Sequence, residues 1–430
     1  LIGKNAGTAI TGGDNNTAVG QGALVTNTTG SDNVAVGDDA LRLNTGSYNT
    51  AVGTDCLDDN TANTNTGVGY RALYQNTTGT LNVAVGANAL DANTTASNNT
   101  AVGYAALTTN TTGGSNTATG RMALQLNTTG ADNTAFGVNA LQQNTTASNN
   151  TAVGKNCLNA NTTGSYNSSV GYESLASNTT GIQNCAFGYR TLKANTTANS
   201  NTSFGYASLY VNTTGANNTA VGDAALQANT TASNNTALGY QALVANTTGT
   251  ENVAVGAYAL VACTTGSYNH AIGMRCGNAI TTGEKNVLIG HNTAYYMTTG
   301  NRNTAVGNYC MADANVTSDK NSGYGDNACR ELTTGEKTTG IGCQALYNLT
   351  TGDSNTAIGH NAGFSVTTGD NNTFLGDYAR GSSTTDHQVV IGHNMDAGNT
   401  NYKVAIYNGQ VNANFTGSAS SWTFTSDGRD

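Results

Sequence analysis

The chain of 430 residues contains 54 Gly and no Pro, and only 10% of its residues are charged, against roughly a quarter in an ordinary globular domain. This composition argues against an ordinary two-domain enzyme. The formal net charge of −9, with only 16 Lys and Arg, argues against a dedicated binder of nucleic acid or anionic membranes, and no run of 18 apolar residues predicts a membrane span.

A glycine that follows an apolar residue recurs from Gly3 to Gly392 and marks 24 repeat units. We call it the repeat glycine. From Gly69 to Gly307 its interval is 17 residues, fourteen times in succession. Disordered low-complexity sequence has no reason to keep a fixed period, so the repeat indicates a stack of structural units.

The idealised unit reads N-T-A-V-G-x-x-A-L-x-x-N-T-T-G-x-x, and residues 99–115 are one example. Two short strand-like pieces joined by Gly and Asn turns fit this length, which is too short for helical repeats of about 33 residues or more. We therefore expect an all-β fold, a β-solenoid or β-roll of about 24 coils that occupies residues 1–400. At ~4.8 Å per coil the stack would be roughly 115 Å long.

Two apolar pairs recur in each unit, represented by Ala101-Val102 and Ala106-Leu107. Adjacent strand residues point to opposite faces, so one residue of each apolar pair would face the interior of the coil and the other would face outward. The coil interior can bury only the first of the two. Lateral association of chains would bury the other side. The alternative is that the repeat glycine lies at a bend or bulge that turns both members inward. The sequence leaves open whether Ala101 or Val102 faces a partner chain.

An Asn column precedes the strand of each unit. Asn stands four residues before the repeat glycine in 21 of 23 units, with Thr338 and Gln388 as the departures. Stacked amides can hydrogen-bond from coil to coil and satisfy turn backbone, so this column predicts an Asn ladder. Asn-Thr-Thr sequons such as the one at Asn110 are interpreted as the turn of the repeat rather than as glycosylation acceptors.

The eight Cys do not have the spacing of a disulfide framework or a zinc site. Four of them share the slot three residues after the repeat glycine, where Ala is usual, and are expected to be small buried side chains: Cys56, Cys157, Cys276 and Cys310.

His360, Asp377 and His393 share the slot just after the repeat glycine in three consecutive units, which would stack them about 5 Å apart. This is the best metal-like constellation in the sequence. Because no fourth ligand or supporting partner can be named, an exposed polar column without a metal is favoured, and no cofactor is expected.

Tyr172, Tyr189 and Tyr206 occupy the same slot in successive units. Such an aromatic ladder could contact glycans, because exposed aromatic patches often mark interaction sites. Stacking within the solenoid, which requires no ligand, is the alternative.

Catalysis by the repeat region is not expected. No G-x-S-x-G, H-E-x-x-H, P-loop or Rossmann context is present, and the Asp and Glu residues look scattered, without a column of paired carboxylates. Ice binding is disfavoured as well, because the paired Thr residues are adjacent and would point to opposite sides.

The N-T-A-V-G and N-V-A-V-G units resemble the short repeats of trimeric autotransporter adhesin heads, which are left-handed parallel β-rolls associated three around an axis. Repeats of the T-A-V-G-x-x-A-L type are also similar to those of phage tail fibres and tailspikes. The resemblance covers Leu1 to about Gly392 and implies a homotrimer. Adhesin heads commonly use a coil shorter than this one.

The period is lost from about Asn401, so residues 401–430 are expected to form a separate β-rich tip or stem. The ending T-S-D-G-R-D resembles the junction at which phage tailspikes and fibres join a C-terminal intramolecular chaperone that trimerises the fibre and then cuts itself off. This resemblance places the cut between Ser426 and Asp427. The chaperone's own catalytic lysine would lie downstream, so self-cleavage is not expected of this chain.

These resemblances imply a homotrimeric phage tail fibre, a rigid non-enzymatic shaft on the virion surface that attaches to a host receptor such as a glycan. A bacterial trimeric surface adhesin or extracellular filament is the alternative. A polysaccharide-degrading tailspike and an ice-binding solenoid are less favoured. No nucleic-acid partner and no membrane insertion are expected.

Overall fold

The structure is a computed structural model that describes residues 1–313, 315–407, 412–415 and 423–425. It divides into two compact units, Leu1–Asn217 (unit 1) and Asn218–Asp430 (unit 2), which are described separately. Within the described residues, both units are built of strands and turns without any helix.

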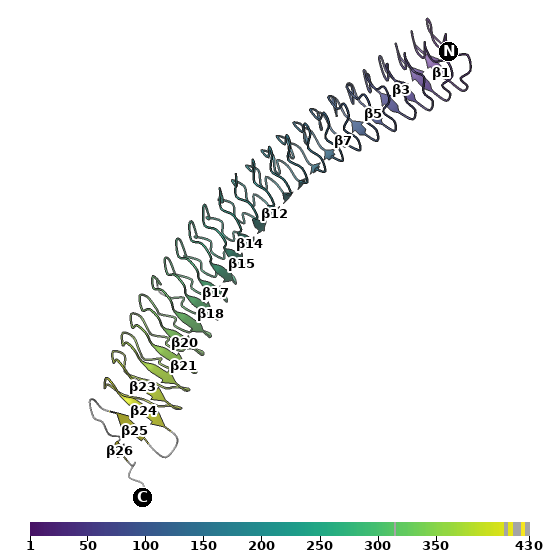
Figure 1. Ribbon diagram of the computed structural model, residues 1–430. Helices are drawn as coiled ribbons and strands as arrows, with labels where there is room; N and C mark the ends of the chain where they lie inside the picture. Colours follow the sequence, from purple (N-terminus) through teal and green to yellow (C-terminus); the bar gives the residue numbers. More distant parts are fainter. Residues whose placement is uncertain (314, 408–411, 416–422, 426–430) are drawn as a thin grey trace. The chain divides into compact units, whose positions relative to one another are not determined.

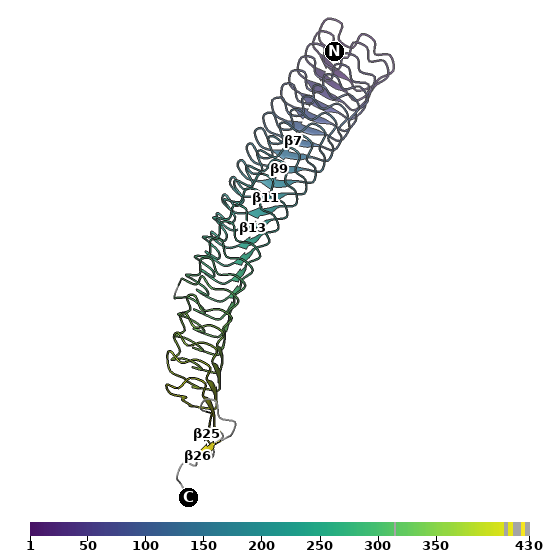
Figure 2. The same cartoon turned by 60° about the vertical axis from the view of Figure 1, so that its left-hand side comes forward.

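Unit 1 carries one three-residue strand in each coil from β1 to β12: β1 (Thr17–Val19), β2 (Val34–Val36), β3 (Thr50–Val52), β4 (Thr66–Val68), β5 (Val83–Val85), β6 (Thr100–Val102), β7 (Thr117–Thr119), β8 (Thr134–Phe136), β9 (Thr151–Val153), β10 (Ser168–Val170), β11 (Cys185–Phe187) and β12 (Thr202–Phe204). Figure 2 shows β7, β9 and β11 stacked one above another along this unit.

Unit 2 continues the pattern and ends differently: β13 (Thr219–Val221), β14 (Thr236–Leu238), β15 (Val253–Val255), β16 (His270–Ile272), β17 (Val287–Ile289), β18 (Thr304–Val306), β19 (Ser322–Tyr324), β20 (Thr339–Ile341), β21 (Thr356–Ile358), β22 (Thr373–Leu375), β23 (Val389–Ile391), β24 (Val404–Tyr407), β25 (Asn412–Phe415) and β26 (Thr423–Thr425). The strand β24 still pairs in parallel with β23, whereas β24, β25 and β26 pair antiparallel (Figure 1).

Within unit 1, and within unit 2 up to β24, consecutive strands pair in parallel with partners about one repeat apart. In β6 and β7, for example, Ala101 lies opposite Ala118, which is 17 residues later. The fold is therefore a parallel β-solenoid of about 23 to 24 turns with a 17-residue period, which confirms the predicted architecture.

The first apolar pair is divided between the inside and the outside of the coil. In each strand from β1 to β23 the middle residue is buried, and the first and third residues point outward. In β6, Ala101 is fully buried while Val102 is 36% exposed. The alternative in which a bend turns both members inward is therefore wrong for this pair, and Val102 is the member available to a partner chain.

The second apolar pair behaves in the opposite way. The predicted second strand is absent, because residues 103–109 form a series of turns. Leu107 has the left-handed value φ = 52°, and both Ala106 and Leu107 are fully buried in the same coil. The Leu107 amide still donates to the next coil, at Ala123 O (3.0 Å). The second pair therefore requires no partner chain.

Two Asn ladders run through the interior. The Asn116 amide N–H donates to Oδ1 of Asn99 in the preceding coil (2.9 Å), and its side-chain Nδ2 donates to Gly130 O (2.9 Å). In the second ladder, Nδ2 of Asn110 donates to Asn93 Oδ1 (3.0 Å) and to Gly113 O (2.9 Å). The predicted ladder is thus confirmed, and the sequon asparagine Asn110 is a second buried column, with its amide nitrogen engaged in the core.

In some coils a small residue at a strand centre accompanies a different residue in the preceding turns. Gly stands at the strand centre beside a buried Cys in three coils, Gly67 with Cys56, Gly323 with Cys310 and Gly340 with Cys329, whereas the strands after Cys157 and Cys276 have Ser169 and Leu288 at their centres. Where the strand centre is large, the Leu slot holds Gly instead, as in Gly363 with Phe374. A close-packed interior tolerates little change in total volume, so in these coils the two slots vary together.

We expect Gly67→Ala to destabilise its coil by about 1 to 3 kcal/mol. Ala is usual at this position, but here a Cβ would lie 2.6 Å from the Cys56 sulfur. The double variant with Cys56→Ala recreates the common Ala and Ala pair and should recover most of the loss in a thermal melt. Additive losses in the double variant would show that the two slots are independent.

Candidate interaction surface

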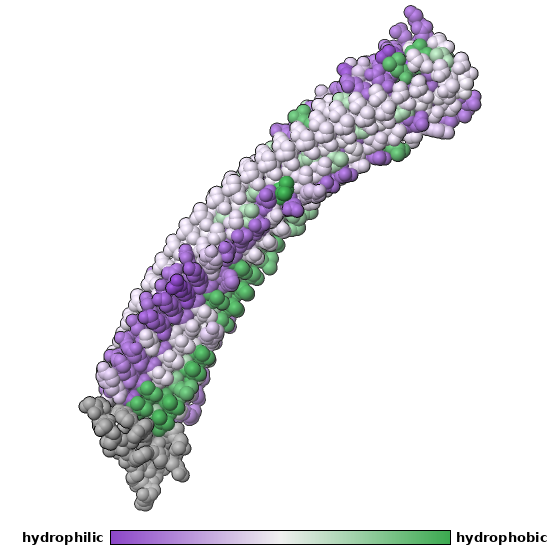
Figure 3. All heavy atoms as spheres, in the orientation of Figure 1, coloured by the Kyte–Doolittle hydropathy of each residue, from purple (hydrophilic) through white to green (hydrophobic). Residues whose placement is uncertain are grey.

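The outward residues of β1–β23 form a surface that we call the strand face. In unit 1 the third position of six of the twelve strands leaves an apolar side chain 36–57% exposed, and the other six are less exposed: Val52, Val68, Val85, Val102, Phe136 and Phe204 are the exposed ones. In unit 2 the same position leaves a side chain 39–47% exposed in seven of the eleven strands from β13 to β23: Leu238, Ile272, Ile289, Tyr324, Ile341, Ile358 and Leu375. In Figure 3 the apolar residues of unit 2 gather in a row along the edge where Figure 1 shows β17 to β23.

The strand face is also free of formal charge. No Asp, Glu, Lys or Arg occurs in any strand from β1 to β23, although 10% of the chain is charged. Monomeric proteins rarely expose long contiguous apolar patches, and the centres of protein interfaces are depleted in charged residues. The strand face therefore has the composition of an interface.

The structure brings the three predicted ladder tyrosines together in unit 1. The ring centroids of Tyr172 and Tyr189 are 5.4 Å apart at 15°, and those of Tyr189 and Tyr206 are 5.2 Å apart at 2°. Both faces of Tyr189 are covered by its neighbours, so a ligand would meet ring edges, hydroxyl groups and the outer faces of the end rings. Glycan contact at this ladder stays a prediction.

An ion-pair cluster accompanies the tyrosine ladder. Glu173 Oε2 accepts from Lys193 Nζ (2.8 Å) and from Arg190 Nε (3.0 Å), and the Arg190 guanidinium lies 5.1 Å from the Tyr189 ring centroid. The hydrogen bond from Lys193 is the main cause that lowers the pKa of Glu173 to about 2. The carboxylate therefore stays ionised at any ordinary pH and holds both cations beside the rings.

His360, Asp377 and His393 also lie together, as their shared slot predicts. Asp377 Oδ1 is 3.0 Å from His360 Nδ1, and Asp377 Oδ2 is 3.4 Å from His393 Nε2. The two imidazoles thus contact different oxygens of one exposed carboxylate. Across the described residues, no group of three His, Cys, Asp or Glu side chains is arranged to hold a metal ion.

Carboxylates form a column in unit 2, so the expectation that they are scattered is wrong. The amide of Asp353 donates to Asp370 Oδ1 (2.7 Å), and the amide of Asp370 donates to Asp386 Oδ1 (2.8 Å). Ser97 fills the same role in unit 1, where its hydroxyl accepts from the amide of Thr80 (3.0 Å). These carboxylates accept hydrogen bonds from backbone amides of the preceding coil. The column could have been found in the sequence, because Asp353 and Asp370 each directly follow the glycine of an Asn-Thr-Thr-Gly or related turn.

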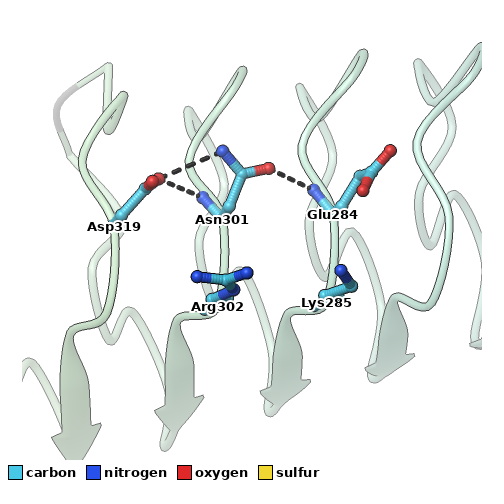
Figure 4. A pocket seen from close by; sticks show the side chains of 5 residues that line it. All are labelled: Glu284, Lys285, Asn301, Arg302 and Asp319. Atoms are coloured by element: carbon cyan, nitrogen blue, oxygen red, sulfur yellow. Dashed lines mark hydrogen bonds between the residues drawn. The ribbon is translucent and has the colours of Figure 1, made fainter.

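A charged hollow of about 280 Å³ lies beside this column (Figure 4). Asp319 Oδ1 accepts from the backbone and side-chain nitrogens of Asn301 (2.7 and 3.1 Å), and Asn301 Oδ1 accepts from the Glu284 amide (2.8 Å). Lys285 and Arg302 form a second row nearer the strands. These side chains extend the inter-coil hydrogen bonds and present both charges to solvent.

The cysteines behave as the shared slot predicts. Cys56, Cys157, Cys276 and Cys310 are fully buried, and none of the eight Cys forms a disulfide. Burial raises the pKa of Cys56, Cys263 and Cys276 to about 12. These thiols are therefore protonated and unreactive near neutral pH.

Alkaline pH should destabilise the fold above pH 9. A free thiol in the unfolded chain ionises near pH 9, whereas the buried thiols keep their protons up to about pH 12. Above pH 9 the unfolded state therefore binds fewer protons than the folded state. The free energy of unfolding keeps its full value below pH 9 and falls above it by roughly 1.4 kcal/mol per pH unit for each buried thiol. Urea unfolding between pH 8 and 11 measures the slope, and Cys56→Ala should reduce it. An unchanged midpoint over this range would contradict the assignment.

The predicted cleavage junction Ser426-Asp427 lies outside the described residues. The described part of the chain includes no helix long and apolar enough to cross a membrane. In comparisons with known proteins, no family model matches the chain and no curated protein is significantly similar to it.

Proposed function

We propose that this chain is the shaft of a homotrimeric attachment fibre, most closely of the phage tail-fibre type, in which three copies cover one another's strand faces. The observation that carries the proposal is the strand face itself, whose third positions form a column of mostly apolar, uncharged side chains in both unit 1 and unit 2. A trimer places this face around a common axis and leaves the turns in water.

The hydrogen-bond pattern suits a mechanical role. Within a unit, neighbouring coils are joined through their strands, through turns such as those at Leu107 and Thr109, and through two Asn ladders. Bending or stretching such a stack would have to break several ladders at once. This supports a rigid spacer rather than a flexible linker.

The phage assignment rests on the resemblance of the repeats and of the T-S-D-G-R-D ending. Under this proposal the fibre lies on the virion surface, its receptor is on the host cell, and the C-terminal residues adjoin the assembly chaperone. No reaction is assigned to the shaft.

Attachment is tested with fluorescently labelled protein and intact bacteria of several species. We expect saturable binding to some strains, competed by excess unlabelled protein, together with unchanged viscosity of their purified surface polysaccharide. Binding to no strain, or binding that never saturates, would contradict an attachment role. A falling viscosity would instead favour a polysaccharide-degrading tailspike.

A further inference from the structure

Unit 2 contains a second hollow, of about 230 Å³, which we call the tyrosine hollow. Its walls are the rings of Tyr295, Tyr296 and Tyr309, together with Arg275 and Asp313. These residues come from the turns that follow the repeat glycines after β16, β17 and β18. Tyr296 is 52% exposed and Tyr309 is 37% exposed, so both rings are within reach of a ligand.

The hollow exists because one coil departs from its neighbours. Five residues after the repeat glycine, successive coils carry Tyr295, Ala312 and Arg330. Ala312 is only 1% exposed and lies between two large side chains, so it leaves a depression one coil wide. At this fifth position, a depression forms only where a small residue lies between large side chains of the neighbouring coils.

The rings are fixed in different orientations. Tyr295 and Tyr296 meet edge to face, with centroids 4.6 Å apart, and His291 packs edge to face on Tyr309 at 5.6 Å. Unlike the tyrosine ladder of unit 1, this cluster has no parallel ring stack that covers both faces of a tyrosine. The Arg330 guanidinium lies 5.3 Å from the Tyr309 ring centroid, so the aromatic surface that remains available in this concave site belongs mainly to Tyr295 and Tyr296.

Two polar groups that line the hollow have no hydrogen-bond or ion-pair partner within the described residues. The Arg275 guanidinium is exposed and takes part in no ion pair or side-chain hydrogen bond found within the described residues; it lies 5.9 Å from the ring centroid of Tyr258. Oδ1 of Asn292 is buried and accepts no hydrogen bond. By contrast, Asp313 is neutralised by an ion pair with Arg330. With Asp313 paired to Arg330, the unpaired Arg275 leaves the hollow with a net positive charge.

We propose that the tyrosine hollow binds a carboxylated sugar, such as the uronic acid unit of a surface polysaccharide. The aromatic rings would contact the C–H groups of the pyranose, and Arg275 would pair with the carboxylate, for which a planar guanidinium is well suited. Sites for small ligands are usually lined by aromatic and apolar side chains, with a small number of polar groups that point toward the ligand. This inference rests on the proposed attachment function and names its ligand class.

The site is compatible with assembly through the strand face. Asn292 follows β17 by three residues, and the hollow occupies the turns between the repeat glycine and the Asn-Thr-Thr turn. The strand face is formed by the three residues that precede each repeat glycine in the sequence, whereas the hollow is formed by residues that follow it. Covering the strands with partner chains would leave these turns at the outer surface.

Saturation-transfer NMR on the full chain tests the proposal, with D-galacturonate as the probe and D-galactose as its neutral match. We expect binding of galacturonate in preference to galactose. Arg275→Gln and Tyr296→Ala should each weaken galacturonate binding by about tenfold or more, since hydrogen bonds to a charged group are among the stronger ones. Arg302→Gln, which removes an exposed Arg outside the hollow, should leave it unchanged.

Equal binding of galactose and galacturonate, no binding of galacturonate, or an equal loss in Arg302→Gln would overturn the assignment. The same samples are measured for assembled mass and for attachment to cells. If wild-type protein assembles and attaches while galacturonate does not bind, the hollow is misassigned and the attachment function stands. If it neither assembles nor attaches, the attachment function itself fails.

Discussion

Gly103→Ala should destabilise its coil severely, by about 3 kcal/mol or more, although it adds a single methyl group. Gly103 has φ = 138°, a backbone conformation that residues with a Cβ rarely adopt. A Cβ at this position would also lie 2.6 Å from the carbonyl oxygen of Gly120 in the next coil. Neither atom belongs to a side chain that could rotate away. Thermal unfolding and limited proteolysis around residue 103 measure the loss.

Gly113→Ala is the matched control. Its Cβ would meet the Gly130 carbonyl oxygen at an even shorter 2.2 Å, yet Gly113 is not among the residues with positive φ. Other coils already carry Ala in this slot, at Ala96 and Ala147, so the backbone there can adjust. We expect little loss. Equal destabilisation by the two substitutions would show that crowding alone, rather than the backbone conformation, keeps the repeat glycine in every unit.

Asp in place of Val102 and Asp in place of Ala101 should fail in different ways. Ala101 is fully buried inside its coil, so Ala101→Asp places an unpaired carboxylate in the core and should cost several kcal/mol of coil stability. Val102 is 36% exposed on the strand face, so Val102→Asp should leave the coil folded. In a trimer, however, it would bring three carboxylates together near the axis and weaken assembly.

Circular dichroism and light scattering separate the two effects. The Val102→Asp chain should keep the wild-type spectrum and melting profile at low concentration while its assembled mass falls. The Ala101→Asp chain should lose signal and become protease-sensitive near residue 101. Thr100→Asp, which alters the other outward position of β6, is expected to weaken assembly less, because Thr is already polar. If Val102→Asp changes neither mass nor stability, the strand face is not an interface.

The periodic features were predictable because they follow from pattern alone. A period of 17 residues with Gly, Asn and alternating strand residues predicts stacked coils, and strand alternation predicts that one member of the Ala101-Val102 pair faces inward. Which member faces inward required the structure. The inward turn of both Ala106 and Leu107 was missed because it requires a left-handed backbone at a Leu. One signal was present: Gly7, Gly277 and Gly363 occupy the Leu slot in three coils, each with φ near 60°.

The tyrosine hollow could not be predicted from the repeat, because it arises where the repeat is broken. Ala312 is unremarkable in an alignment of units, and its effect depends on the bulk of Tyr295 and Arg330 in the adjoining coils. The tyrosine ladder and the His360, Asp377 and His393 column were found because they share one slot. The sequence did not predict that the faces of Tyr189 are covered or that Asp377 contacts both imidazoles; these features were seen only in the structure.

The measurement that tests the central claim most directly is the solution mass of the chain by light scattering, at several concentrations and without denaturant. Cover of the strand face by identical partners predicts a mass three times that of the 43.6 kDa chain, independent of concentration above the assembly threshold. A persistent 43.6 kDa monomer would contradict the trimeric account, since the apolar side chains of the strand face would then remain in water.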